Sequence, residues 1–361
     1  MSKIISIGTA LPAFRHRQQD ILQFMLNAYQ PEGDDRRKIA LLYERCGIEA
    51  RYSVMPDYSV NMQERLFYPQ TMDMEPFPTL EKRMEWYAMH APALSVEAIG
   101  QCMDGYIDKS ELTWLITVSC TGMSAPGLDI NIMQQLQLSS AIQRSSINFM
   151  GCYAAVHALK LADAICKSDQ NAKVLIVCTE LCTLHFQKGN EMDNIASSLL
   201  FGDGAAAVLV TGDSCPLDGL SIKGFHSEVA LQGQQDMAWH LSGQGFLMRL
   251  SAYIPQLIRE GISPLLKNAL EATGMEKSDI TKWAIHPGGK KILETIQKEL
   301  CLQDGDLAAS FNVLNDYGNM SSPTILFVLK EIMAQVKGKS ERIFAAAFGP
   351  GLTMETLILE Q

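Results

Sequence analysis

The sequence has no long apolar run. Its longest apolar stretches have the length of a strand, such as residues 343–348 (IFAAAF), and none approaches the roughly 20 residues that a membrane-spanning helix needs. The first residues, MSKIISIGTA, also lack the charged and apolar segments of a secretory signal peptide, and they predict a strand that leads into a loop. We therefore expect a cytoplasmic protein with no membrane partner.

Positive charge is also scarce. The 361 residues include 30 Lys and Arg against 40 Asp and Glu, which gives a formal net charge of −10. Because binding to nucleic-acid phosphates needs a local excess of positive charge, we expect no nucleic-acid partner. An anionic ligand would have to use one of a few basic groups: residues 36–38 (RRK), Arg45, Arg51 and residues 290–291 (KK).

Cysteines at metal-binding or disulfide spacings are missing too. The chain has nine cysteines, an odd number, and only Cys178 and Cys182 lie close together, on or just after an apolar, strand-like run. This pattern argues against a disulfide framework and against structural zinc. We expect no metal site, and reduced thiols that mostly pack as small apolar side chains.

What the sequence does have is an alternation of strand-like and helix-like runs, which begins near Leu112 and continues to the end. Such alternation favours an α/β fold in which helices cover the sheets. With 361 residues, 47% of them hydrophobic, the chain can bury a large core, as two or three domain-sized units or as one fused α/β body. Residues 55–78, rich in Pro and Met, predict irregular surface structure.

The alternation contains a repeat. In the first half the predicted strands are residues 114–120, 146–150 and 173–178, with helices at 128–138 and from Cys152 to about Cys166. In the second half the predicted strands are residues 283–286, 311–314 and 342–347, with helices at 291–300 and from Asn319 to about Val336. Two similar βαβαβ halves with polar residues at their strand-to-helix junctions suggest a duplication around one shared site.

One of these junctions carries a cysteine. Gly151 precedes Cys152, and Ala154 and Ala155 follow it, so small neighbours leave the sulfur open to a ligand. A helix N-terminus favours thiolate over thiol, and the pattern is therefore that of an activated nucleophile. A packed core thiol explains this stretch equally well.

Two junctions in the second half carry a histidine and an asparagine. His286 is followed by Pro-Gly-Gly, a tight turn that lets a ligand come close, although a surface-loop histidine fits the same pattern. Asn319 precedes a predicted helix, where it is either an ordinary N-cap or an amide donor to a developing oxyanion.

Five segments together resemble the type III polyketide synthases, the chalcone synthase family: GCYAAVHALKLA, FGDGAAAVLV, IHPGGKKILETI, DYGNMSSPTILFVL and AAFGPGLTMETLIL. The match runs in order over most of the chain and includes IISIGTALP and SCTGMSAPGLDI. Ala347 departs mildly from the pattern, since plant members often have glycine at this position.

The resemblance implies a thiolase-type αβαβα layered fold made of two duplicated βαβαβ halves, residues 1–215 with the nucleophile and residues 216–361 with its partners. It also implies a homodimer and a catalytic triad of Cys152, His286 and Asn319. The substrates would be an acyl-CoA starter and malonyl-CoA, and no cofactor would be needed.

The resemblance further implies a set of substrate-binding residues. Phe201 matches the aromatic gatekeeper of the family, and the second gatekeeper position falls on Met248, two residues after Phe246. Arg51 matches a basic position in the CoA-binding segment. By alignment around the triad, the pocket lining should include Cys120, Cys182, His185, Phe201, Trp239 and Ser321. If the Trp239 indole points inward, it removes cavity volume and favours a short product, unless a side tunnel opens beside Cys120.

The function we expect is iterative decarboxylative condensation of malonyl-CoA onto an acyl-CoA starter held on Cys152, followed by cyclisation or release. One alternative is a ketoacyl synthase III-like enzyme that makes a single extension with an acyl carrier protein. A second alternative, from another class, is a non-catalytic acyl-binding or scaffold protein on the same fold.

Overall fold

The computed structural model describes residues 2–189, 192–251 and 253–361 of the chain. Within them, one nine-stranded sheet has the order β11-β12-β13-β8-β1-β7-β6-β4-β5. Its strands are β1 (Ser2–Ala10), β4 (Trp114–Ser119), β5 (Gln143–Asn148), β6 (Lys173–Leu181), β7 (Asp203–Gly212), β8 (Leu220–Val229), β11 (Lys282–Ile285), β12 (Arg342–Gly349) and β13 (Thr353–Glu360).

The sheet consists of two parts with a narrow join. Strands β1 and β8 pair only through Lys3 with Ser221 and Ile4 with Leu220, whereas β1 and β7 pair along their whole length. The pairs β4–β5, β4–β6 and β11–β12 are parallel, and the others are antiparallel. The short join lets the two parts turn relative to each other and enclose helices between them.

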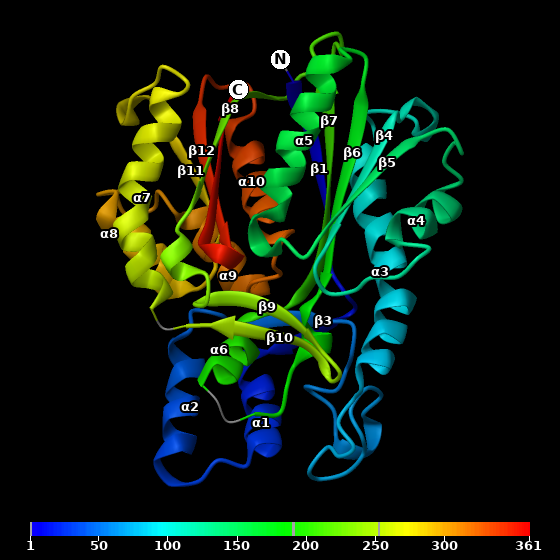
Figure 1. The fold of residues 1–361 in the computed structure, drawn as a ribbon, viewed down its shortest axis with the longest axis vertical. Coiled ribbons are helices and arrows are strands. Elements are labelled where there is room, and N and C mark those ends of the chain that lie inside the picture. Colours follow the sequence, from blue (N-terminus) through cyan, green and yellow to red (C-terminus); the bar gives the residue numbers. More distant parts are fainter. Residues whose placement is uncertain (1, 190–191, 252) are drawn as a thin grey trace.

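The helices form the remaining layers (Figure 1). They are α1 (Gln18–Tyr29), α2 (Gly33–Arg45), α3 (Leu80–Met103), α4 (Leu128–Leu136), α5 (Ala154–Ser168), α6 (Met192–Leu200), α7 (Ile254–Glu271), α8 (Lys290–Glu299), α9 (Ala308–Tyr317) and α10 (Thr324–Val336). Helix α5 packs on β6, β7 and β13, and α10 packs on β1, β7 and β11, so both lie between the two parts of the sheet. Helices α3 and α4 cover one outer face, and α7 and α8 cover the other (Figure 1). This is the predicted αβαβα arrangement.

One predicted strand is a helix. Residues 311–314 were expected to be extended, but they belong to α9, where Ala309 and Val313 are buried four positions apart, as are Ser310 and Leu314. This spacing places all four side chains on one face of a helix. The short apolar run alone was ambiguous, and among the described residues the second half has no counterpart of the edge strand β5.

A smaller group of elements lies below the layered body in Figure 1. It contains α1, α2, α6, the strand pair β2 (Phe14–Arg17) and β3 (Ala50–Ser53), and the hairpin of β9 (Met237–Ser242) and β10 (Gly245–Leu250). Residues 55–78 are mostly irregular, as predicted, but they do not lie only on the surface. Their buried aromatic and sulfur-containing side chains are Met55, Tyr58, Phe67, Tyr68 and Met74, which this loop supplies to the core under α1.

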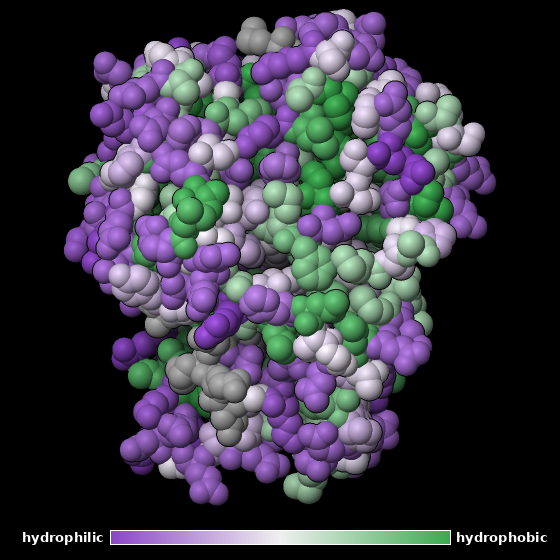
Figure 2. Space-filling model, in the orientation of Figure 1, coloured by the Kyte–Doolittle hydropathy of each residue, from purple (hydrophilic) through white to green (hydrophobic). Residues whose placement is uncertain are grey.

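The face of the molecule seen in Figure 2 has both hydrophilic and apolar regions. Figure 2 shows hydrophilic residues over much of the upper left and the bottom of the face in view, with apolar residues gathered across its middle. The hairpin contributes exposed Leu241 and Leu247. No helix within the described ranges has both the length and the apolar character that crossing a membrane requires.

Candidate active site

Cys152 lies on a sharp turn between β5 and α5. Strand β5 ends at Asn148, Phe149 and Gly151 have φ of 58° and 76°, and a 3₁₀ turn over Gly151–Tyr153 leads into α5. Glycine is required at position 151 for two reasons: its φ is positive, and a Cβ at this position would lie 2.4 Å from Pro350 Cδ. The turn buries the thiol just before the start of α5.

Asn319 faces this thiol from the other half of the chain. Its Nδ2 lies 3.9 Å and its Oδ1 3.8 Å from Cys152 Sγ. The Oδ1 atom accepts hydrogen bonds from Ser321 N at 2.8 Å and Thr324 Oγ1 at 3.4 Å, which leaves Nδ2 as the free donor. Helix α10 begins at Thr324 with Pro323 as its N-cap, so Asn319 does not cap it.

His286 follows the last residue of β11. Its backbone N–H donates to Ala346 O at 2.8 Å, and its side chain is 1% exposed. Among the described residues neither ring nitrogen has a hydrogen-bond partner, which is unusual for a buried histidine. The imidazole therefore has both positions open to a ligand, and it is not on the surface.

Burial shapes the protonation of this pair. It raises the pKa of the Cys152 thiol to about 11, although hydrogen bonds with Ser321 and Asn319 act in the opposite direction. Burial also lowers the pKa of His286 to about 3. Neither group ionises by itself, but a proton moved from the thiol to the imidazole creates two charges that stabilise each other.

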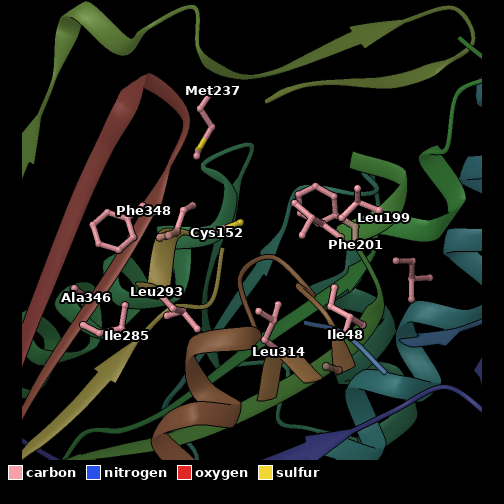
Figure 3. Packing of buried hydrophobic residues seen from close by; sticks show 14 of the residues in the cluster. Ile48, Cys152, Leu199, Phe201, Met237, Ile285, Leu293, Leu314, Ala346 and Phe348 are labelled. Carbon is pink, nitrogen blue, oxygen red and sulfur yellow. The ribbon is translucent and has the colours of Figure 1, made fainter. Parts of the chain in front are cut away.

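The three side chains line one cavity, and the residues predicted to bind substrate line it with them: Arg51, Cys120, Cys182, His185, Phe201, Trp239, Met248 and Ser321. Figure 3 shows Cys152, Phe201 and Phe348 reaching this region from different elements. The space is narrow, since the volume open to the centre of a water molecule is about 70 Å³. Phe246, the other gatekeeper candidate, is buried against His185 and is not part of the lining.

Trp239 points into the cavity from the hairpin. Its Nε1 donates to Cys120 O at 2.8 Å, and its ring meets His185 and Phe246 edge-on with centroids 5.7 and 5.8 Å apart. The indole is therefore held against the loop after β4, beside Cys120, and does not pack outward.

His185 lines the cavity but has no free nitrogen. Its Nε2 contacts Thr121 O at 2.7 Å, its Nδ1 accepts from Phe246 N at 3.2 Å, and its ring stacks on Phe246. Burial lowers its pKa to about 3, so the ring is neutral with the proton on Nε2. Its predicted contact with substrate is therefore limited to the face and edge of the ring.

Arg51 does not lie where the sequence placed it. The side chain is 2% exposed, with Nε donating to Gln18 Oε1 at 3.0 Å and Nη1 donating to Phe201 O at 2.5 Å. CoA phosphates remain near solvent at the mouth of a site, so this burial does not fit the expected phosphate contact.

Glu180, near the end of β6, was missed by the sequence analysis. It is fully buried and accepts hydrogen bonds from Cys120 N, from Thr121 Oγ1 at 2.7 Å and from Ser322 Oγ at 2.8 Å. It thereby joins the loop after β4 to the turn that carries Asn319. The signal in the sequence was a single charge inside the apolar strand KVLIVCTEL.

Comparison with known proteins identifies the family. The model of the N-terminal domain of chalcone and stilbene synthases matches residues 1–214, and the model of their C-terminal domain matches residues 225–361. The chain belongs to the type III polyketide synthases. As a member of this family it is an enzyme of the transferase class, and neither a ketoacyl synthase III-like reaction nor a non-catalytic scaffold is favoured.

Individual type III polyketide synthases agree with this assignment. The chain is 34% identical over 291 residues to "Alpha-pyrone synthesis polyketide synthase-like Pks18" of Mycobacterium tuberculosis. The aligned segment covers 78% of this chain and 74% of the relative. A crystal structure of PKS-I from the brown alga Ectocarpus siliculosus has a TM-score of 0.92 at 26% identity and covers 100% of this chain and 98% of its own. The type III polyketide synthase domain of Steely1 from Dictyostelium has a TM-score of 0.91 at 26% identity, with coverages of 100% and 99%.

Type III polyketide synthases use CoA thioesters and need no cofactor. Within the described part of the chain, no group of three or more His, Cys, Asp or Glu side chains is arranged to hold a metal ion. All nine cysteines are free thiols, and three of them, Cys120, Cys152 and Cys182, line the cavity.

Proposed function

We propose that Cys152 carries the acyl chain as a thioester while His286 and Asn319 donate hydrogen bonds to the thioester oxygen. The observation that carries this proposal is the convergence of three buried groups on one cavity, where neither ring nitrogen of His286 has a partner among the described residues and the Nδ2 of Asn319 donates only toward the thiol. Fixed donors in a dry cavity are well suited to an oxyanion, because they need no reorganisation during the reaction.

The starter step begins with transfer of the thiol proton to His286. The thiolate attacks the carbonyl carbon of an acyl-CoA, and the oxygen becomes an oxyanion that accepts from Asn319 Nδ2 and from the imidazolium. Collapse of this intermediate breaks the bond to the CoA sulfur, and the departing CoA thiolate takes the proton from the His286 imidazolium, which becomes neutral again. The acyl group remains on Cys152.

The extension step uses the same two donors. They hold the thioester oxygen of malonyl-CoA, so that loss of CO2 leaves an enolate stabilised by hydrogen bonds. The enolate carbon attacks the Cys152 thioester, a C–C bond forms, and Cys152 leaves as thiolate. Transfer of the lengthened chain back to Cys152 permits another round, and cyclisation or hydrolysis ends it.

We further propose a short product, such as a pyrone or a small resorcinol-type ring. The inward Trp239 and the small free volume of about 70 Å³ support this, because space limits chain growth. The mycobacterial relative that is named for alpha-pyrone synthesis supports it independently.

Three further features are proposed from the family resemblance. They are a homodimer, a cytoplasmic location, and a division into residues 1–215 and 216–361. Sedimentation of the purified chain tests the first of these directly.

The experiment that tests the function is incubation with malonyl-CoA and a panel of acyl-CoA starters, without acyl carrier protein. We expect CO2 release and products extended more than once. Cys152→Ala should abolish acyl transfer and condensation, whereas Cys166→Ala, which removes a buried thiol of α5, should retain both. Full condensation by the Cys152→Ala protein would contradict the proposal.

A further inference from the structure

The catalytic cavity has a positively charged wall that the proposed chemistry does not use. Arg51 lines this cavity, and its Nη2 is buried without a hydrogen-bond partner in the described part of the chain. The other two nitrogens are occupied by Gln18 Oε1 and Phe201 O. One N–H₂ group of this buried guanidinium therefore has no partner among the described residues, although the residue lines the cavity.

The charge of Arg51 is not balanced by an opposite charge within the described ranges. Among the described residues no carboxylate forms an ion pair with it. The buried carboxyl of Asp203 accepts instead from Val54 N, Thr183 N and Thr183 Oγ1, and burial raises its pKa to about 6. A buried, unpaired guanidinium is costly, and the cost is relieved when an anion binds.

The guanidinium is also held in a fixed position. A Cβ on Gly318 would lie 2.8 Å from Arg51 Cγ, and a Cβ on Gly202 would lie 3.4 Å from Arg51 Cβ, so the stem packs closely against both glycines. These glycines flank Asn319 and Phe201, which form a β-bridge with each other. Arg51 is therefore rigidly placed relative to the catalytic amide, as a binding group should be.

Other polar groups lie on the same wall. Ser197 and Ser198 of α6 and Tyr58 line the cavity beside Arg51. Ser198 Oγ contacts Tyr43 OH at 3.0 Å, and the positive charge of Arg51 partly offsets the rise that burial causes in the pKa of Tyr43. Together with Arg51, these residues supply polar groups to a cavity that also has apolar lining from Phe186, Met248 and Phe348.

We propose that Arg51 binds a carboxylate at the far end of the starter, so that the subsite selects mono-CoA thioesters of dicarboxylic acids. The proposal rests on the function proposed above, with the thioester end of the same starter at Cys152. The aliphatic chain between the two ends lies along the apolar lining. A charge-assisted hydrogen bond from Nη2 to the carboxylate gives a partner to the one guanidinium nitrogen that lacks one among the described residues.

The carboxylate of malonyl-CoA is a poorer match for this subsite. That carboxylate must lose its charge when CO2 departs, and a guanidinium bound to it would stabilise the ground state more than the transition state. Binding the extender there would therefore slow the step that the enzyme accelerates. A starter carboxylate keeps its charge throughout the reaction.

The test compares succinyl-CoA with butyryl-CoA, and glutaryl-CoA with valeryl-CoA, as starters. We expect kcat/KM to favour the carboxylate member of each pair, and Arg51→Gln to reduce that ratio by about tenfold or more. Because both starters of a pair are tested with the same variant, a general loss of activity caused by disturbing Phe201 lowers both kcat/KM values and cancels in their ratio. Arg65→Gln is the matched control, because Arg65 is also buried with an unpartnered nitrogen but does not line the cavity. That variant should keep the wild-type ratio.

An equilibrium measurement separates this proposal from the catalytic one. In the Cys152→Ala background, calorimetry should show tighter binding of succinyl-CoA than of butyryl-CoA, and Arg51→Gln or Arg51→Lys should remove or reduce the difference. This holds even if no starter is ever condensed. The proposal is overturned if the protein with Arg51 shows no preference, if the preference survives in the Arg51→Gln protein, or if only the KM for malonyl-CoA changes. Should Arg51→Gln fail to fold, Arg51→Lys and the preference of the Cys152→Ala protein still decide the matter.

Discussion

At the scale of single residues, the side chain of Asn319 is the part of the site whose orientation is best determined. Its Oδ1 accepts from Ser321 N and Thr324 Oγ1, so of the two amide atoms near Cys152 Sγ, Nδ2 is the one that can donate to a substrate. An amide without those two contacts would rotate between two equivalent positions. The backbone of this turn therefore decides which atom meets the substrate.

Replacing Asn319 by Ala should impair malonyl-CoA decarboxylation and chain condensation together, because one donor serves both oxyanions. Loss of one such donor typically costs about a hundredfold in rate or more. Release of labelled CO2 and formation of extended product measure the two steps separately. If thermal stability fell while both rates stayed normal, Asn319 would be a structural residue only.

Replacing His286 by Ala should make Cys152 harder to ionise. Burial raises the pKa of the thiol and lowers that of the imidazole, so direct transfer between them is the easiest route for the proton. Without the imidazole the thiol must give its proton to solvent, and the midpoint of its alkylation by iodoacetamide should move to higher pH. An unchanged alkylation profile would show that His286 does not accept this proton.

At the scale of elements, the hairpin β9–β10 closes one side of the cavity. Trp239 on β9 reaches Cys120 O, and Phe246 on β10 stacks on His185. The hairpin is joined in this way to the loop after β4 and to the segment after β6. The position of the hairpin therefore sets how much room the growing chain has.

Replacing Trp239 by Gly should lengthen the products or admit bulkier starters, with malonyl-CoA decarboxylation largely intact. The indole occupies the cavity next to Cys120, and its removal opens that space without touching the triad. Mass spectrometry of the product mixture checks this. Trp239→Phe is the matched control, since it keeps most of the bulk and loses only the N–H donor, and it should preserve product length. A loss of folding with the same product spectrum would contradict this role.

At the scale of the whole molecule, Glu180 connects the two halves through a buried carboxyl. Burial raises its pKa to about 7 despite its hydrogen bonds with Thr121 and Ser322. Burial lowers the pKa of His185 and His286, each to about 3. The same core thus holds groups whose effects on stability have opposite dependence on pH.

For Glu180 the folded protein holds more protons than the unfolded chain between about pH 4.3 and pH 7, so the free energy of unfolding falls as the pH rises through this range. For the two histidines the unfolded chain takes up more protons below about pH 6.5, so the free energy of unfolding falls as the pH drops toward 3. Each sign follows from which state binds the extra proton.

Glu180→Gln should therefore gain stability relative to the wild type as the pH rises from about 5 to about 8. Thermal unfolding midpoints across this range measure the difference. Glu97→Gln, a change at an exposed position on α3, should show no such trend. A constant difference between the Glu180→Gln protein and the wild type at every pH would mean that Glu180 does not titrate on unfolding.

Much of the architecture was already predictable from local patterns. The alternation of strands and helices and the turn at Gly151 depend on residue spacing and on conformational freedom, which are properties of neighbouring residues. The motifs around Cys152, His286 and Asn319 also indicated a shared site, because they end elements at matching places in the two halves. Strand β6 also contains Glu180, a buried charge that the sequence prediction did not include in the site.

Packing between distant segments decided the rest. Residues 311–314 form part of α9 because Val313 and Leu314 find buried positions only on a helical face. Arg51 is buried because Gly202 and Gly318 close on its stem, and Trp239 points inward because Cys120 O accepts its N–H. These partners are separated from one another by more than a hundred positions in the chain, so no local pattern contains them. The direction of each side chain, and with it the shape of the cavity, exists only once the two halves have packed together.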